Sequence, residues 1–202
     1  MEKYIAITFD DGPHPVHTVR LLEELKKREA KGTFFVLGQE VEEYPEILRQ
    51  IVAEGHEVGN HSFTHPHLSE LLALEIYQEI QCCQNSIEKI IGQKPRIFRP
   101  PFGDINETLL GICQQMDKAL VMWSADAQDW RVNDVDLIVE NVLAGELDFG
   151  IILMHDVHEH SVDAACIIMD KLCAQGYKFE TVSRLFELAG KELTSGLVVG
   201  KA

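Results

Sequence analysis

Short apolar runs alternate along the chain with longer segments in which apolar residues recur every three or four positions. The short runs are rich in Ile, Val and Phe, which is typical of strands buried in a sheet. The longer segments have the period of helices that bury one face. This pattern predicts seven strands, over residues 4–9, 32–37, 56–59, 96–98, 119–123, 150–154 and 177–180.

A helix is predicted after each strand, over residues 16–28, 39–54, 69–91, 106–116, 133–143, 161–175 and 182–189. Ser69 and Asn133 stand where N-cap residues are expected, and Gly55 and Gly92 stand where a glycine ends a helix. Such alternation indicates an α/β fold with a parallel sheet covered by helices, either closed into a barrel or open. We expect a single domain over residues 1–193 and a small, apolar tail without fixed structure over residues 194–202.

The 202 residues are enough for one domain with a full hydrophobic core. With 18 basic and 33 acidic residues the formal net charge is -15, so we expect neither nucleic acid nor an anionic membrane as a partner. No apolar run is long enough to span a bilayer, and the first residues lack the features of a signal peptide. We therefore expect a cytoplasmic protein as the sequence stands, or an exported one if a leading segment has been removed.

Chemically reactive side chains gather where the predicted strands end. In parallel α/β folds the active site lies at the carboxyl ends of the strands, so these residues are candidates for catalysis. They are of three types only, Asp, His and Arg: Asp10, Asp11, His61, His65, Arg99, Asp126, Asp129 and His155.

Two of these groups suit a metal ion. Asp10 and Asp11 point in different directions, so one suits a metal ligand and the other a general base, although Asp-Gly is also common in plain acidic turns. His61 and His65 are four residues apart, which on a helical turn places both imidazoles on one side, as zinc requires; a solvated histidine-rich loop is the alternative. Two His and one Asp leave a position open for water, which is the pattern of catalytic metal sites.

The other strand-end residues suit acid–base and oxyanion chemistry. Arg99 keeps its proton and can hold a carboxylate ionised, unless it forms only a surface salt bridge. The backbone N–H of Phe102, in a loop stiffened by two prolines, can face an oxyanion. His155 is either a satisfied core histidine or, with an aspartate beside it, a general acid. Trp130 is either a core residue or an apolar wall for a sugar.

Five motifs follow one another between Thr8 and His155, over most of the chain. They are Thr8-Phe9-Asp10-Asp11-Gly12-Pro13, His61-Ser62-Phe63-Thr64-His65, Arg99-Pro100-Pro101-Phe102-Gly103, Asp126-Ala127-Gln128-Asp129-Trp130 and Leu153-Met154-His155. In type and order they resemble the motifs of the NodB-homology polysaccharide deacetylases, a metal-dependent carbohydrate esterase family. The resemblance implies a distorted parallel (β/α) barrel with about seven strands. No catalytic position is replaced, which argues against an inactive relative.

The resemblance also implies which residues bind the metal and activate water. Asp11, His61 and His65 would hold one divalent metal ion, usually zinc, with cobalt, nickel or manganese as other candidates. Asp10 would be the general base, tethered by Arg99.

The same resemblance implies the acid and the walls of the pocket. His155 would be the general acid, oriented by Asp129, and the N–H of Phe102 would face the oxyanion. Trp130 and Leu153 would shape the pocket for the acetyl methyl group.

The activity implied by the resemblance is hydrolysis of an amide bond other than a peptide bond. We expect the substrate to be an N-acetylglucosamine-containing poly- or oligosaccharide, peptidoglycan or chitin-like, with release of acetate. Alternatives are deacetylation or deformylation of a nucleotide- or lipid-linked amino sugar, deacetylation of a xylan ester, and hydrolysis of small non-sugar amides. A sugar-binding domain without activity would need a broken metal triad, and a structural metal site would need a fourth ligand such as His67 or His158. The sequence does not define the oligomeric state.

Overall fold

The structure, a computed structural model that describes residues 2–202, contains all seven predicted strands. They are β1 (Lys3–Asp10), β2 (Gly32–Val36), β3 (Glu57–Asn60), β4 (Ile97–Phe98), β5 (Ala119–Val121), β7 (Ile151–His155) and β8 (Tyr177–Phe179). Two more strands, β6 (Ala125–Asp126) and β9 (Val198–Val199), have two residues each and are too short to give a periodic pattern. The predicted α/β class is confirmed.

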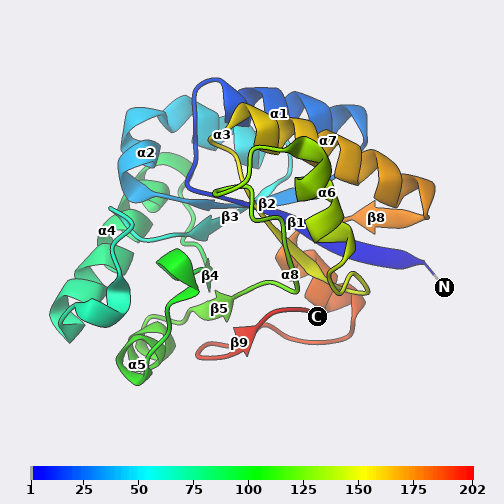
Figure 1. Cartoon of the computed structure of the whole chain (residues 1–202). Helices are drawn as coiled ribbons and strands as arrows, with labels where there is room; N and C mark the ends of the chain where they lie inside the picture. Colours follow the sequence, from blue (N-terminus) through cyan, green and yellow to red (C-terminus); the bar gives the residue numbers. More distant parts are fainter. Residues whose placement is uncertain (1) are drawn as a thin grey trace.

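The strands form one parallel sheet in the order β6-β7-β1-β2-β3-β4-β5-β9, and β8 pairs with the first part of β1. The two edges of this sheet meet where the end of the chain reaches the segment before β7. There Lys201 forms an antiparallel bridge with Gly150, and the N–H of Ala202 donates to the carbonyl of Phe149 at 3.0 Å. The sheet therefore curls into a distorted parallel barrel, as the resemblance implied (Figure 1).

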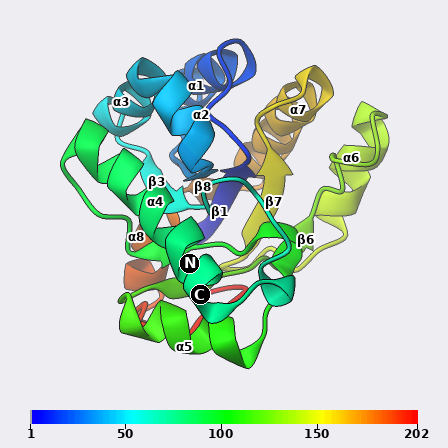
Figure 2. The ribbon, with the colours of Figure 1, turned by 90° about the vertical axis from the view of Figure 1, so that its left-hand side faces the viewer.

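Helices surround the curled sheet (Figure 2). Within residues 2–202 the α-helices are α1 (His17–Lys27), α2 (Gly38–Glu43), α3 (Pro45–Ala53), α4 (Ala73–Ile91), α5 (Glu107–Gln115), α6 (Val135–Leu143), α7 (Glu159–Ala174) and α8 (Val182–Leu188). Two 3₁₀ turns, η1 (Leu68–Glu70) and η2 (Pro101–Gly103), lie in the loops after β3 and β4. None of these helices combines the length and the apolar character needed to cross a membrane.

Two predicted helices differ in the structure. The helix predicted over residues 39–54 is divided into α2 and α3, because Pro45 has no N–H to continue a helix and instead takes the first position of a new one. The helix predicted from Ser69 begins only after Leu72, whose N–H donates to the carboxylate of Glu75 at 2.8 Å. The hydroxyl of Ser69 bonds to Asp104 instead. Local propensity alone did not reveal these tertiary partners.

The chain end is also more ordered than the sequence suggested. Residues 194–202 contain β9, which pairs with β5 through Leu120–Val198 and Val121–Val199. The apolar tail thus covers the edge of β5 and forms backbone hydrogen bonds with it, which its short sequence did not predict.

The core of the protein fills both faces of the central strands with apolar side chains. Residues 5–10 of β1 are buried on both faces, as expected for a parallel strand covered by helices. Inside the curl, Phe35 and Val121 pack against Leu185 and Phe186 of α8. The inside of the curl is therefore filled by apolar side chains, whereas Asp10, His61, Arg99 and His155 lie at the carboxyl ends of the strands.

Candidate active site

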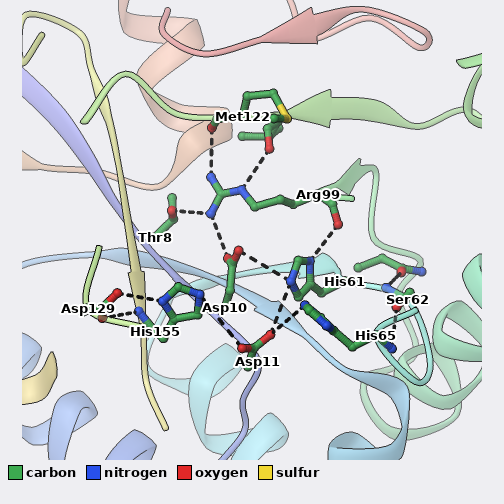
Figure 3. Close-up of polar contacts among 12 residues, drawn as sticks. Thr8, Asp10, Asp11, His61, Ser62, His65, Arg99, Met122, Asp129 and His155 are labelled. Atoms are coloured by element: carbon green, nitrogen blue, oxygen red, sulfur yellow. Dashed lines mark hydrogen bonds and ion pairs between the residues drawn. The ribbon is translucent and has the colours of Figure 1, made fainter. Parts of the chain in front are cut away.

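The strand-end residues predicted from the sequence come together at one edge of the sheet (Figure 3). The register explains part of this convergence, because Asp10 on β1 lies directly beside His155 on β7. His61 follows β3, and Arg99 follows β4, whose Phe98 pairs with Asn60. Parallel neighbours that end at the same level present their next residues to one space.

Asp11, His61 and His65 form a group that suits a metal ion. One ligand atom from each lies within 4.8 Å of the other two. Asp11 Oδ1 is 3.4 Å from His61 Nε2 and 3.4 Å from His65 Nε2, which is too long for strong hydrogen bonds. Asp11 Oδ1 is buried and has no hydrogen-bond partner among the described residues. A buried oxygen left unpartnered between two imidazoles is what a shared cation would satisfy, so the residues fit such an ion.

A contact of the ring orients the His61 imidazole, whereas a hydrogen bond of the backbone N–H holds the loop at His65. His61 Nδ1 lies 2.7 Å from the carbonyl of Arg99, which leaves Nε2 directed at Asp11. The N–H of His65 donates to Ser62 Oγ at 3.0 Å. Both Ser62 and His65 have positive φ values, of 69° and 61°, so the predicted helical turn is wrong: a tight non-helical loop brings the two rings together.

Electrostatics favour an anionic Asp11 and a neutral His65. Burial alone would raise the pKa of Asp11, but His61 and the other nearby imidazoles hold it at about 2. Burial lowers the pKa of His65. For His61 burial also acts downward, but Asp10 and Asp11 outweigh it and raise its pKa. A proton therefore competes with a cation mainly at His61.

Asp10 is held on the other side of the group by a buried guanidinium. Arg99 is 0% exposed, so the alternative of a surface salt bridge is wrong. Its Nη1 donates to Asp10 Oδ1 at 2.8 Å and to Thr8 Oγ1 at 2.7 Å, while its Nε and Nη2 donate to the carbonyls of Val121 and Met122. The fork geometry fixes the Asp10 carboxylate with its second oxygen, Oδ2, 3.6 Å from His61 Nε2.

His155 lies on the opposite side of the group from Asp10 and forms two hydrogen bonds with Asp129. Asp129 Oδ1 is 2.7 Å from His155 Nδ1, and Oδ2 accepts the backbone N–H of His155 at 2.9 Å. Burial alone would lower the pKa of His155, but Asp129, followed by Asp10 and Asp11, raises it to about 9. The free Nε2 therefore carries a proton and faces Asp11 Oδ2 at 4.0 Å.

The sequence and the fold were compared with known proteins. Residues 1–121 match the family described as polysaccharide deacetylase. The chain belongs to the polysaccharide deacetylase family.

Individual relatives of this polysaccharide deacetylase domain have names that refer to cell-wall sugars. It is 44% identical over 187 residues to the peptidoglycan-N-acetylmuramic acid deacetylase PdaC of Bacillus subtilis, with 93% of this chain and 39% of that protein covered. It is 36% identical over 194 residues to the peptidoglycan-N-acetylglucosamine deacetylase PgdA of Listeria monocytogenes, with 96% of this chain and 40% of that protein covered. The chain thus spans about two fifths of the length of these relatives.

Solved structures agree with the fold of the deacetylase domain. The structure of B. subtilis PdaC superposes with a TM-score of 0.89 at 44% identity, covering 94% of this chain and 92% of that chain. A structure described as T48 deacetylase with substrate gives a TM-score of 0.91 at 39% identity, covering 98% of this chain and 96% of that chain. The NodB-homology resemblance and the barrel that it implied are confirmed.

A cavity of about 430 Å³ opens beside Asp11, His61 and His65. Phe102, Trp130 and Leu153 line it, as the sequence predicted. Phe102 and Trp130 are 58% and 61% exposed, so neither is a core residue. Phe102 has a φ of 59°, and its ring stacks on that of His67 at 3.8 Å between centroids. His67 is thereby engaged with an aromatic ring and lies outside the group of three ligands.

Two residues of the site were missed by the sequence analysis. Trp123 lines the cavity, and its ring lies 5.6 Å from the Arg99 guanidinium. Its place at the end of a predicted strand was the available signal. Asp156 lies fully buried next to His155 in the sequence, and its environment only becomes visible in three dimensions.

Proposed function

We propose that the protein is a metal-dependent hydrolase that removes N-acetyl groups from N-acetylglucosamine-containing poly- or oligosaccharides, peptidoglycan or chitin-like, and releases acetate. One observation carries the proposal: an open group of three metal ligands lies between an arginine-paired carboxylate, Asp10, and a histidine held protonated by Asp129. The names of PdaC and PgdA, both peptidoglycan deacetylases, support this substrate class.

Asp11, His61 and His65 would hold the metal ion, and zinc is the proposed ion because two imidazoles and one carboxylate form a common catalytic zinc set. Such an ion, when bound, polarises the acetyl carbonyl and lowers the pKa of water toward ~7. Cobalt, nickel and manganese ions also bind imidazole and carboxylate donors, so they are further candidates for the same three residues.

The residues of the chain divide the proton transfers between two flanks. Asp10 accepts a proton from the attacking water, and the hydrogen bond from Arg99 Nη1 orients that carboxylate. On the other flank His155 Nε2 donates its proton to the sugar nitrogen as the C–N bond breaks, because an amine leaves only when protonated. The separation of the two flanks lets one group act as base while the other acts as acid.

The loop after β4 would stabilise the negative charge that develops on the carbonyl oxygen. Within η2 the turn is closed by the N–H groups of Gly103 and Asp104, which donate to Pro100 and Pro101. We assign the N–H of Phe102 to the oxyanion, where one such donor contributes about 3–4 kcal/mol. Trp130 and Leu153 would provide apolar walls for the acetyl group and the sugar face.

The alternatives from the sequence are less well supported. A nucleotide- or lipid-linked sugar or a xylan ester is not favoured by the first relatives, whose names specify peptidoglycan. A structural metal site would require a fourth ligand, whereas within residues 2–202 the converging group comprises three residues. The cytoplasmic location stays a prediction.

Acetate release from peptidoglycan fragments, chitin oligomers and acetylated xylan tests the proposal. We expect release from the N-acetylated substrates, its loss on chelation and its return with added zinc. His155→Ala should abolish turnover while metal stays bound, whereas His158→Ala, an exposed histidine three residues away, should leave both unchanged. Full activity of His155→Ala would remove this residue as the acid, and a lack of release from every sugar would refute the function.

A further inference from the structure

A completely buried carboxyl group, that of Asp156, lies against the turn that carries Asp11. The residue is 0% exposed, and its backbone N–H donates to the carbonyl of Asp10 at 3.4 Å. None of the roles proposed above uses this group. Burying a carboxyl group costs free energy of folding unless hydrogen bonds or charge pairs compensate, so the position of Asp156 requires a physical reason.

The contacts of Asp156 connect three segments. One carboxylate oxygen, Oδ2, accepts a hydrogen bond from Thr18 Oγ1 on α1. Thr18 Oγ1 accepts in turn from the N–H of His14 at 2.7 Å. The other carboxylate oxygen, Oδ1, is buried and has no hydrogen-bond partner among the described residues. Asp156 therefore ties the end of β7 to the segment between β1 and α1.

The same carboxyl group fills the space next to Gly12. A Cβ atom added at Gly12 would lie 2.5 Å from both carboxylate oxygens of Asp156. Gly12 is not among the residues with positive φ, so its backbone conformation accepts an alanine and only the carboxyl group forbids one. On another side the carbonyl of Gly12 accepts the N–H of Leu37 at 3.0 Å. Gly12 is thus held between Asp156 and the end of β2.

Asp11, the neighbour of Gly12, needs such support. Its φ of 75° is in the left-handed region, which residues with a side chain adopt only when their surroundings hold them there. In this conformation Asp11 Oδ1 faces His61 and His65 at equal distances. A small movement of the turn would move this oxygen away from the imidazoles.

We propose that Asp156 is a positioning residue of the metal site: its carboxyl group, fixed between Gly12 and Thr18, holds the turn in which Asp11 faces His61 and His65. The inference rests on the metal binding proposed above. It explains the glycine of the Asp-Asp-Gly-Pro motif by a contact that lies 144 positions further along the sequence (156 minus 12).

Zinc affinity measured by competition with a chromophoric chelator tests the proposal. Asp156→Ala removes both contacts and should weaken zinc binding about 10- to 100-fold, the usual effect of losing a group that orients a metal ligand. Asp156→Asn keeps the shape and an acceptor for Thr18, so its affinity should stay close to that of the unchanged protein. Thr18→Val removes the two hydrogen bonds of the Thr18 hydroxyl, to Asp156 and from the N–H of His14, with little change in volume, and should give an intermediate loss. Asp163→Asn, on the same helix that follows Asp156, is the control and should change nothing.

Comparing the free energy of unfolding of each metal-free variant with its zinc affinity distinguishes a positioning role of Asp156 from a purely structural one. Urea unfolding in EDTA should show that Thr18→Val and Asp156→Asn fold, and their zinc affinities then decide the question even if Asp156→Ala fails to fold. Unchanged zinc affinity in Thr18→Val and in a folded Asp156→Ala would overturn the inference while leaving the metal site intact. If the unchanged protein binds no zinc, the proposed function itself fails, which is a different result.

A double-mutant cycle tests the contact with Gly12 directly. Gly12→Ala should weaken zinc binding strongly, because the new methyl group collides with the Asp156 carboxyl group. In Gly12→Ala/Asp156→Ala the collision is gone, so the loss of affinity should be smaller than the product of the two single losses. Strictly multiplicative losses would show that the carboxyl group does not hold the turn.

Discussion

The most informative perturbation of the acid–base pair is Asp129→Asn, because it removes a charge with almost no change in volume. Asp129 uses both oxygens on one residue: Oδ1 lies 2.7 Å from His155 Nδ1, and Oδ2 accepts the backbone N–H at 2.9 Å. An amide has only one acceptor oxygen, so one of these two bonds is lost. His155 then also loses the main negative charge that keeps it protonated.

The magnitude follows from the pKa of His155, which is about 9 beside Asp129 and 6.5 for an ordinary histidine. At pH 8 a group with a pKa of 9 is about 90% protonated and one with a pKa of 6.5 about 3%, a ratio of about 30. At pH 6 the same two groups are both largely protonated and differ by less than about 1.5-fold. The expected loss of activity is therefore small in weak acid and grows with pH.

The assay is kcat/KM for acetate release from chitin oligomers between pH 5.5 and 9. Asp148→Asn, in an exposed loop, removes one negative charge elsewhere and should leave the profile unchanged. A bound cation offsets the charge of Asp11, so the alkaline limb of the unchanged enzyme should lie somewhat below 9 and that of Asp129→Asn lower still. An equal loss at every pH would refute the reasoning, since His155 would then not be the titrating acid that Asp129 controls.

Four other perturbations have defined outcomes. His61→Ala should lose the bound metal, and retention of one ion per chain by elemental analysis would exclude His61 as a ligand. Chelation should stop acetate release until zinc is restored, whereas activity that survives full metal removal would contradict a metal-dependent reaction. Trp130→Ala should raise KM up to about tenfold with a smaller effect on kcat, because an exposed aromatic wall contributes about 0.5–1.5 kcal/mol of contact; an unchanged KM would remove Trp130 from the substrate site. Burial lowers the pKa of His56 from 6.5 to about 4, so the free energy of unfolding is highest above pH 6.5 and falls as the pH decreases toward 4, by about 2 kcal/mol at pH 5. In His56→Gln the free energy of unfolding, measured with urea, should depend less on pH over this range. An unaltered pH dependence would contradict this role of His56.

The strands of the barrel could be predicted because a parallel sheet buries both faces. Residues 5–10 of β1 and all of β2 are inaccessible, and such segments appear in the sequence as continuous apolar runs. The two strands that were missed, β6 and β9, have two residues each and depend on partners far along the chain. The start of α4 was misplaced because Ser69, the expected cap, bonds to the distant Asp104, and the helix begins instead after Leu72 with Glu75 as its local partner.

The candidate site was accessible from the sequence for a topological reason. Parallel strands end at one edge, so an Asp, His or Arg that follows a strand is brought to the same space whatever the details of the loop. The placement of His61 and His65 was therefore right although the predicted helical turn between them was wrong. Trp123 and Asp156 were missed because their contacts with Arg99 and Gly12 exist only once distant segments have packed.

The site also shows how several carboxylates can share a buried edge in a chain with a net charge of -15. Asp10 is paired with Arg99, and Asp129 is paired with His155, each at hydrogen-bond distance. Asp156 accepts a hydrogen bond from Thr18, and the cationic partner of Asp11 is the proposed metal ion. Since Asp11 Oδ2 lies 4.0 Å from His155 Nε2, the charge of Asp11 helps to keep His155 protonated until a cation offsets it. Metal binding and the acidity of His155 would therefore be coupled, because a cation held by Asp11 would offset the charge that helps to keep the neighbouring imidazolium protonated.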